Sequence, residues 1–318
     1  MPSLPDCLTD TSKMAGGRPT KWAKLGVQRQ ATSVSSLLQD VATITVATSH
    51  RYVWRGIKNA HYLLHSSLHR RLEQAGLEVN AANLVARELE LLEQARSGGL
   101  QYRNGRELSD ANLLAMLQHS GASTPLLDVT PDPYVALFFA TEPVGEVGPC
   151  ALIAIRVPGK TEADQAAHTF KGALADVGPN GESIRTIGIY ERLHTELHLN
   201  SGDAPPILWE APFVDDRMQA QRGMFLATTA PLNGVDYGSF DADLRSPPEE
   251  KISVEHICDH DRGRYVRPQL VVFYLSADMR KSVGRELDRR FGYRTETIYP
   301  DLAGFALANA SNRAFWSK

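Results

Sequence analysis

The chain has 318 residues, of which 42% are hydrophobic and 22% are charged, proportions typical of a globular protein with a large core. Its formal net charge of -3 gives no overall positive field that would draw the protein to nucleic acid or to an acidic membrane. Three scattered cysteines, Cys7, Cys150 and Cys258, argue against a disulfide framework and suit a reducing compartment.

The N-terminal segment, residues 1–32, is rich in Pro, Gly, Ser, Thr and Lys and has no hydrophobic period, which predicts a flexible tail. Its first residues lack the basic and apolar regions of a signal peptide, and the apolar runs of the chain are too short to span a bilayer. We therefore expect a cytoplasmic protein without membrane contact, although export through a needle-like apparatus would leave no such signal.

Ordered structure is expected to begin near Ser33. The segment that follows this serine up to residue 44 has helically spaced apolar positions, whereas 51–56, RYVWRG, is dense in aromatic and β-branched residues and predicts a strand. Residues 81–96 show the clearest amphipathic helix of the chain. Residues 109–119, SDANLLAMLQH, predict a further helix that starts at a capping serine.

The segment TPLLDVTPDPYVALFFA, residues 124–140, predicts a short buried strand followed at once by a buried helix. Pro131 and Pro133 fit the first turn of that helix, where proline costs little. Side chains at such a junction commonly face a ligand, so Asp128 and Thr130 are expected at the mouth of a site.

Four later strands and two helices complete the pattern. The strands are expected at CALIAIRV, PILWEAPF, MFLATTA and QLVVFYL, and the helices at DDRMQAQR and at SADMRKSVGRELDRRF. Strands and helices are interspersed without the regular alternation of a doubly wound sheet, which favours an α+β domain with helical insertions.

Histidine clusters raise the question of a metal site. In HYLLHSSLH, His61, His65 and His69 would share one face of a helix, but the outer two would lie roughly 12 Å apart, too far to bind one ion together. We interpret them as a helical face of solvated or capping histidines. The segment HICDH, residues 256–260, aligns His, Cys and His on a strand without an apparent fourth ligand. We therefore predict no metal site.

The chain contains no G-x-S-x-G elbow, no P-loop and no G-x-G-x-x-G after a strand. A better candidate is the WRG at the end of the first strand, where Arg55 and Gly56 place a cationic fork beside backbone that a ligand can approach closely. The alternative for Arg55 is a buried ion pair with a carboxylate such as Asp128. For His119, in the last turn of its helix, the alternatives are capping and pocket lining.

The segments VWRG, LQHSGASTPLLDVTPDPYVALFFAT, DRMQAQRGMF and IYPDLAGF, taken in this order, resemble the FRG domain, a bacterial and phage module named for its aromatic-Arg-Gly motif. The resemblance runs over residues 33–310, between the N-terminal tail and a C-terminal tail of residues 311–318. The family usually has an arginine after the threonine of the second segment, where this chain has Pro125. An anionic ligand held by that arginine would need another cation here.

A second resemblance, to ADP-ribosyltransferases of the Arg-Ser-Glu class, rests on the strand arginine, the strand with Ser or Thr, and the helix after a proline. It implies a split β-sheet core, NAD as the substrate, and a catalytic set of Arg55, Thr130 and Gln221, the last where those enzymes carry glutamate. Together with the local signals described above, this resemblance leads us to expect that Arg55, Gly56, His119, Asp128, Tyr134 and Phe138 bind NAD.

Glutamine cannot ionise, so Gln221 supplies neither a base nor an anion for a cationic sugar. Another carboxylate, with Glu210 and Glu255 as candidates, would have to enter the site, or the acceptor would contribute its own activation, or NAD is not turned over. The resemblances imply NAD-dependent ADP-ribosyl transfer or NAD hydrolysis, acting on a protein or nucleic-acid acceptor in a toxin or anti-phage setting, with an antitoxin or immunity protein as a candidate partner. The alternatives are a non-catalytic nucleotide-binding or sensor module and a nucleic-acid-binding protein.

Overall fold

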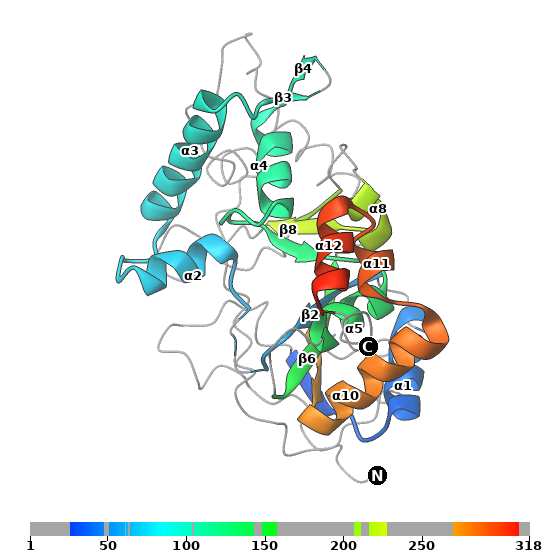
Figure 1. Cartoon of the computed structure of the whole chain (residues 1–318). Coiled ribbons are helices and arrows are strands. Elements are labelled where there is room, and N and C mark those ends of the chain that lie inside the picture. The colour runs from blue at the N-terminus through cyan, green and yellow to red at the C-terminus, as the bar shows by residue number, and fades with distance from the viewer. Residues whose placement is uncertain are drawn as a thin grey trace.

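The computed structural model describes residues 26–47, 51–60, 62, 64–103, 105–142, 148–157, 207–210, 216–227 and 270–311. In this part of the chain helices and strands are interspersed and the strands form small, mostly antiparallel sheets, which confirms the α+β class (Figure 1). None of the described helices is both long and apolar enough to cross a membrane.

The largest sheet has four strands in the order β1 (Gly26–Gln30), β9 (Leu270–Leu275), β6 (Cys150–Val157) and β2 (Arg51–Ile57). Strand β1 runs parallel to β9, whereas β6 is antiparallel to both β9 and β2. The inner strand β6 is apolar from Cys150 to Ile155, as expected for a strand whose two faces are both covered.

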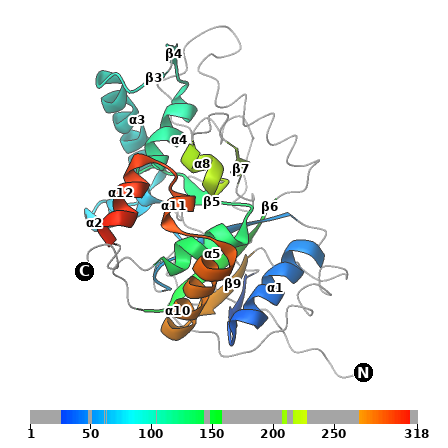
Figure 2. The ribbon, with the colours of Figure 1, turned by 45° about the vertical axis from the view of Figure 1, so that its right-hand side comes forward.

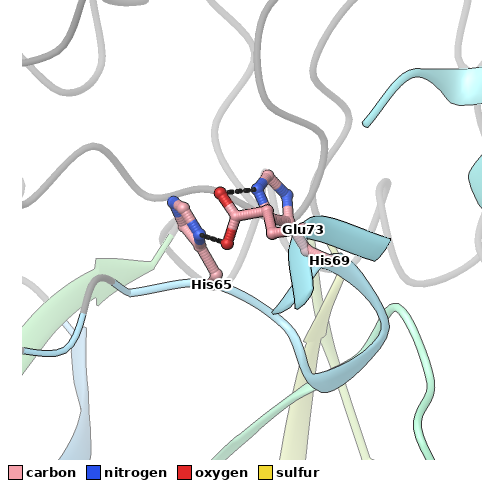
Figure 3. A group of neighbouring side chains, drawn as sticks. All are labelled: His65, His69 and Glu73. Atoms are coloured by element: carbon pink, nitrogen blue, oxygen red, sulfur yellow. Dashed lines mark ion pairs between the residues drawn. The ribbon is translucent and has the colours of Figure 1, made fainter. Parts of the chain in front are cut away.

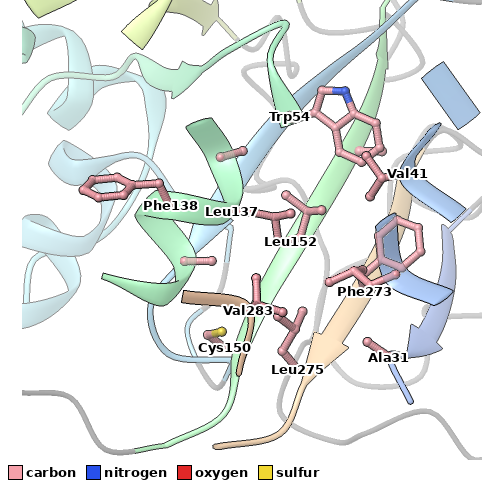
Figure 4. Close-up of a cluster of buried hydrophobic side chains, with 14 of the residues drawn as sticks. Ala31, Val41, Trp54, Leu137, Phe138, Cys150, Leu152, Phe273, Leu275 and Val283 are labelled. Carbon is pink, nitrogen blue, oxygen red and sulfur yellow. The ribbon is translucent and has the colours of Figure 1, made fainter. Parts of the chain in front are cut away.

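The side chains of β6 alternate between two hydrophobic clusters. Leu152 enters the first cluster together with Trp54 and Phe273, whose ring centroids lie 6.5 Å apart in a stacked arrangement (Figure 4). Ile153 enters the second cluster, on the opposite face of the strand. The two clusters therefore pack on opposite faces of the same sheet, and both include residues of the edge strand β2.

Strand β1 corrects the predicted boundary of the N-terminal tail. Residues 26–30 were expected to belong to a flexible tail ending at residue 32, yet they pair with β9 along its length, from Gly26 opposite Leu270 to Gln30 opposite Tyr274. The sequence GVQRQ lacks a strong strand pattern, so its conformation is set by the open edge of β9 rather than by local propensity. Residues 1–25 lie outside the described residues.

A second sheet has three antiparallel strands in the order β5 (Leu127–Val129), β8 (Met224–Ala227) and β7 (Ile207–Trp209). Two backbone hydrogen bonds join it to the first sheet. Trp54 N donates to Thr130 O at 2.7 Å, and Thr130 N donates to Trp54 O at 2.9 Å. Arg55 of β2 and Asp128 of β5, which lie beside this bridge, therefore come from different sheets.

Helix α5 (Pro133–Thr141) packs directly on β2. Asp132 caps it by accepting hydrogen bonds from the backbone N–H groups of Tyr134 and Val135, and Pro133 occupies its first turn as predicted. At the other end, the buried Arg280 donates to the main-chain oxygen of Glu142 at 3.0 Å, which places a cation at the C-terminus of the helix.

Helices α1 (Val34–Ala47) and α10 (Ala277–Glu286) cover the first sheet together with α5 (Figure 2). Helix α10 begins at the predicted cap Ser276 and runs into a π-helical turn, η3 (Leu287–Phe291), which ends at Gly292 in the left-handed region with a φ of 73°. The short helix α11 (Thr295–Ile298) and helix α12 (Leu302–Ser311) follow.

The opposite end of the molecule is helical (Figures 1 and 2). It holds α2 (Ser67–Gln74), α3 (Ala81–Ser97), the hairpin of β3 (Tyr102–Arg103) and β4 (Arg106–Glu107), α4 (Asp110–His119) and α8 (Asp216–Gln221). The predicted cap Ser109 accepts from the backbone of Asn112, and Gly121 after the helix has a φ of 91°. The helices predicted for these segments are confirmed.

Candidate functional site

A cleft of about 720 Å³ opens where the end of β2 meets β5, α4, α8 and α11, a volume in the range of small-molecule and cofactor sites. Both sheets contribute to its walls. Of the eight residues that the sequence assigns to a site, six line this cleft: Arg55, Gly56, His119, Asp128, Thr130 and Gln221.

Arg55 points from β2 toward β5. Its Nη1 donates to the main-chain oxygen of Asp128 at 2.6 Å and lies 3.7 Å from the Asp128 carboxylate, so the predicted alternative of an ion pair is present. Burial lowers the pKa of Arg55, and the charge of Asp128 opposes this shift. Its buried Nε has no hydrogen-bond partner in the part of the chain that the structure describes. The Nε–H group of Arg55 is therefore a hydrogen-bond donor in the cleft wall that no described residue uses.

The Asp128 carboxylate is held from a second side by the last turn of α4. Gln118 Nε2 donates to Asp128 Oδ2 at 2.7 Å, while the side-chain oxygen of the same amide, Gln118 Oε1, accepts from the hydroxyl of Thr124 at 2.5 Å. Thr124 is fully buried, so this chain fixes the orientation of the amide. The Asp128 side chain is still 54% exposed, which leaves a carboxylate open to the cleft.

Thr130 lines the cleft but is 4% exposed. Its hydroxyl oxygen accepts from the backbone N–H of Asp132 at 3.1 Å, so it stabilises the turn that leads from β5 into α5. Its immediate role is therefore to fix the strand-helix junction, with its backbone tied to Trp54 across the two sheets.

Gln221 and His119 lie at the ends of two helices that face the cleft. Gln221, the last residue of α8, donates through Nε2 to the main-chain oxygen of Ile298 at 3.2 Å. His119, the last residue of α4, lies close enough to Asp301 for their charges to interact. Both residues line the cleft.

Tyr134 and Phe138, which the sequence assigns to the NAD site, are not among the lining residues. Tyr134 stacks on Phe291 with ring centroids 5.5 Å apart, and Phe138 is buried in the core of the first sheet. Helix α5 is apolar almost all round, so its sequence does not reveal which face meets the cleft. Phe139 of this helix and Tyr299 form the aromatic wall instead.

Gly56 also lines the cleft, but the close approach that it permits is to a helix rather than to a ligand. A Cβ at this position would lie 1.9 Å from Ala136 O and 2.6 Å from Ala140 N of α5. The glycine of the WRG motif is therefore explained by the packing of α5 on β2.

Among the described residues, the carboxylates that line the cleft are Asp128 and Glu73. The candidate Glu210 does not line it, because its exposed carboxylate pairs with Arg51 at 3.1 Å. Glu255 lies outside the described residues.

Three further cations line the cleft and were missed from the sequence. Arg70 donates to the main-chain oxygen of His65 at 2.7 Å; burial lowers its pKa and the charge of Asp128 opposes this shift. Lys58 pairs with the buried Glu142 at 2.9 Å. Arg217 donates to Asp301 at 2.6 Å and lies 5.1 Å from the ring centre of Tyr299. The sequence does not indicate these three cations, because the acids that interact with them, Asp128, Glu142 and Asp301, are distant along the chain.

The histidines of HYLLHSSLH do not form an exposed helical face. Helix α2 begins only after the cap Ser66, so His65 precedes the helix and His69 lies in its first turn, and both imidazoles are buried. The expected solvated or capping role is therefore wrong for these two residues. His61 and the segment 256–260 lie outside the described residues.

Taken together, the described residues define an α+β protein with a charged, aromatic-walled cleft to which both small sheets contribute. The segment of residues 50–146, from β2 through α5, matches the FRG domain, as the sequence resemblance predicted. It contributes Arg55, Arg70, Asp128 and Thr130 to the cleft. No curated protein and no solved structure matches the chain. The match is shorter than the predicted range of 33–310, which stays a prediction.

Proposed function

We propose that the cleft binds NAD and that the protein transfers ADP-ribose from it to a macromolecular acceptor, on a split-sheet core similar to that of ADP-ribosyltransferases. The observation that carries the proposal is the convergence of Arg55, from β2 of one sheet, and Thr130, which directly follows β5 of the other, on a single cleft of about 720 Å³. The expected toxin or anti-phage setting forms part of the same proposal.

The cleft offers groups that suit a dinucleotide. Arg55 and Arg70 lie on the same side as Asp128 and are suited to pyrophosphate oxygens, since guanidinium groups bind phosphate through several donors. Arg70 thereby provides the cation that Pro125 does not. The aromatic wall of Phe139 and Tyr299 offers surfaces on which a planar ring packs.

The reaction breaks the bond between ribose and nicotinamide, and nicotinamide leaves with the bonding electrons, so positive charge develops on the ribose. Gln221 cannot stabilise that charge as an anion, whereas the half-exposed carboxylate of Asp128 can. The acceptor nucleophile then bonds to the ribose carbon and loses its proton to a carboxylate of the cleft, for which Asp128 and Glu73 are available.

The test combines binding and turnover. We expect NAD to raise the melting temperature of the wild-type protein, because a ligand at 100 times its Kd stabilises the folded state by about 2.7 kcal/mol. The rise should vanish in Arg55→Ala and persist in Arg51→Ala, a matched control on the same strand whose side chain pairs with Glu210 outside the cleft. Nicotinamide release, followed by chromatography, should be lost in Asp128→Asn.

A second function, nucleotide binding without turnover, is favoured by one specific observation. Asp128 is already engaged by Arg55 and Gln118, and the residue at the position of the expected glutamate is an amide. A thermal shift that depends on Arg55, without nicotinamide release in the presence of candidate protein and nucleic-acid acceptors, would establish this function. An absent thermal shift would reject NAD as the ligand.

A further inference from the structure

At the rim of the cleft, two buried imidazoles face one carboxylate. His65, the second residue before α2, and His69, in the first turn of this helix, have ring centroids 3.9 Å apart. Glu73 follows His69 by one helical turn and presents its carboxylate to both rings (Figure 3). One ligand atom from each of the three residues lies within 4.8 Å of the other two.

The contacts within this cluster are too long for good hydrogen bonds. His65 Nδ1 lies 3.4 Å from Glu73 Oε2, and His69 Nε2 lies 3.4 Å from Glu73 Oε1, whereas N–H···O bonds are usually 2.7–3.2 Å long. A tetrahedral zinc ion with bonds of about 2.0–2.1 Å separates its ligand atoms by roughly 3.3 Å. The spacing therefore matches ligands around an ion better than direct partners.

His65 provides a second, independent observation. The residue is 6% exposed, and among the described residues its Nδ1, which faces Glu73, has no hydrogen-bond partner. A buried polar nitrogen without a partner costs free energy unless another group satisfies it. A metal ion bound between His65 and Glu73 would satisfy this atom.

The chemistry of the three residues selects the class of ion. Imidazole nitrogen suits Zn²⁺, Fe²⁺, Cu²⁺ and Ni²⁺, whereas Mg²⁺ and Ca²⁺ prefer oxygen ligands.

We propose that His65, His69 and Glu73 bind a divalent transition-metal ion, Zn²⁺ or an ion of similar ligand preference, at the rim of the cleft. Because His65 and Glu73 both line the cleft, a coordination position that the protein does not fill opens onto the ligand space. An anionic oxygen of a ligand or a water molecule would occupy that position. The site stands on its own geometry and holds whether or not NAD is the ligand.

The test measures metal binding by the full chain without nucleotide, so its result is separate from that of the proposed function. The protein is treated with a chelator, freed of it and titrated with Co²⁺, whose visible absorption reports coordination, and then with Zn²⁺ in competition. We expect one site that Glu73→Gln weakens at least tenfold, since even partners of metal ligands contribute about 10–100-fold to affinity. Mg²⁺ should not displace Co²⁺.

The matched control is Glu78→Gln, which neutralises an exposed glutamate five residues along the chain and outside the cluster, and should bind Co²⁺ like the wild type. Glu73→Asp keeps the charge but withdraws the carboxylate, and should also weaken binding; circular dichroism confirms folding of each variant. Zn²⁺ should raise the melting temperature of the wild type and of Glu78→Gln only. Equal Co²⁺ affinity in the wild type and both Glu73 variants, or no uptake by the wild type, would overturn the proposal.

Discussion

The close approach of α5 to β2 gives the sharpest prediction, the substitution Gly56→Ala. The added Cβ would lie 1.9 Å from Ala136 O, and α5 would have to withdraw by about 1.5 Å to restore an ordinary contact of 3.4 Å. Both of the nearest atoms belong to the backbone of a helix, so no side chain can turn aside. Overpacking of a core typically costs 1–3 kcal/mol, and we expect a loss of about 3 kcal/mol.

The assay is urea denaturation followed by circular dichroism, with the melting temperature as a second readout. With an unfolding entropy of about 2.1 cal/mol/K per residue, a loss of about 3 kcal/mol in a chain of 318 residues corresponds to a fall of about 4–5 °C. Gly148→Ala is the control, because no atom of the described residues lies within 4 Å of its added Cβ and its φ is not positive. Both substitutions replace glycine by alanine and therefore lower the conformational entropy of the unfolded chain to the same extent. Equal stability of the two variants would refute the view that Gly56 serves the packing of α5.

Three further substitutions or treatments test other parts of the structure. Gly304→Ala should lower the free energy of unfolding by about 2 kcal/mol in the same urea assay, because its Cβ would lie 2.0 Å from the main-chain oxygen of Tyr299; an unchanged midpoint would contradict this. Ser276→Ala removes the side chain that accepts from Met279 N and should cost about 1 kcal/mol, whereas Ser276→Asn should restore most of it. Burial raises the pKa of the Cys150 thiol to about 12, so iodoacetamide at pH 8 should label this residue only in denaturant; labelling of the native protein, seen by peptide mass spectrometry, would show that the thiol is accessible.

Local sequence signals were sufficient for much of the fold. The strand-to-helix junction at 127–141 is confirmed because a buried strand, an Asp cap and Pro133 all favour the same local structure. Strand β1 was missed because GVQRQ is polar, and only the open edge of β9, more than 200 residues away in the chain, makes it a strand.

The cleft was predicted where its residues carry local signals, and missed where it depends on contacts distant in sequence. Arg55 and Asp128 are 73 residues apart, yet the strand end and the helix junction marked both. The His65, His69 and Glu73 cluster was missed because it depends on where α2 begins, since a start before His65 would have spread the histidines along one helix. The wall residue Phe139 could not be told from Phe138, because neighbouring positions of α5 are all apolar.

The contact between Arg55 and Asp128 joins a strand of one sheet to a strand of the other, beside the two backbone hydrogen bonds that link Trp54 and Thr130. A ligand that draws the guanidinium toward its own phosphate removes one tie between the two halves of the molecule. Occupancy of the cleft and the freedom of the halves to shift against each other are then thermodynamically coupled, and the coupling acts equally in both directions. A second molecule that binds to both sheets would therefore change the affinity of the cleft for its ligand without contacting that ligand.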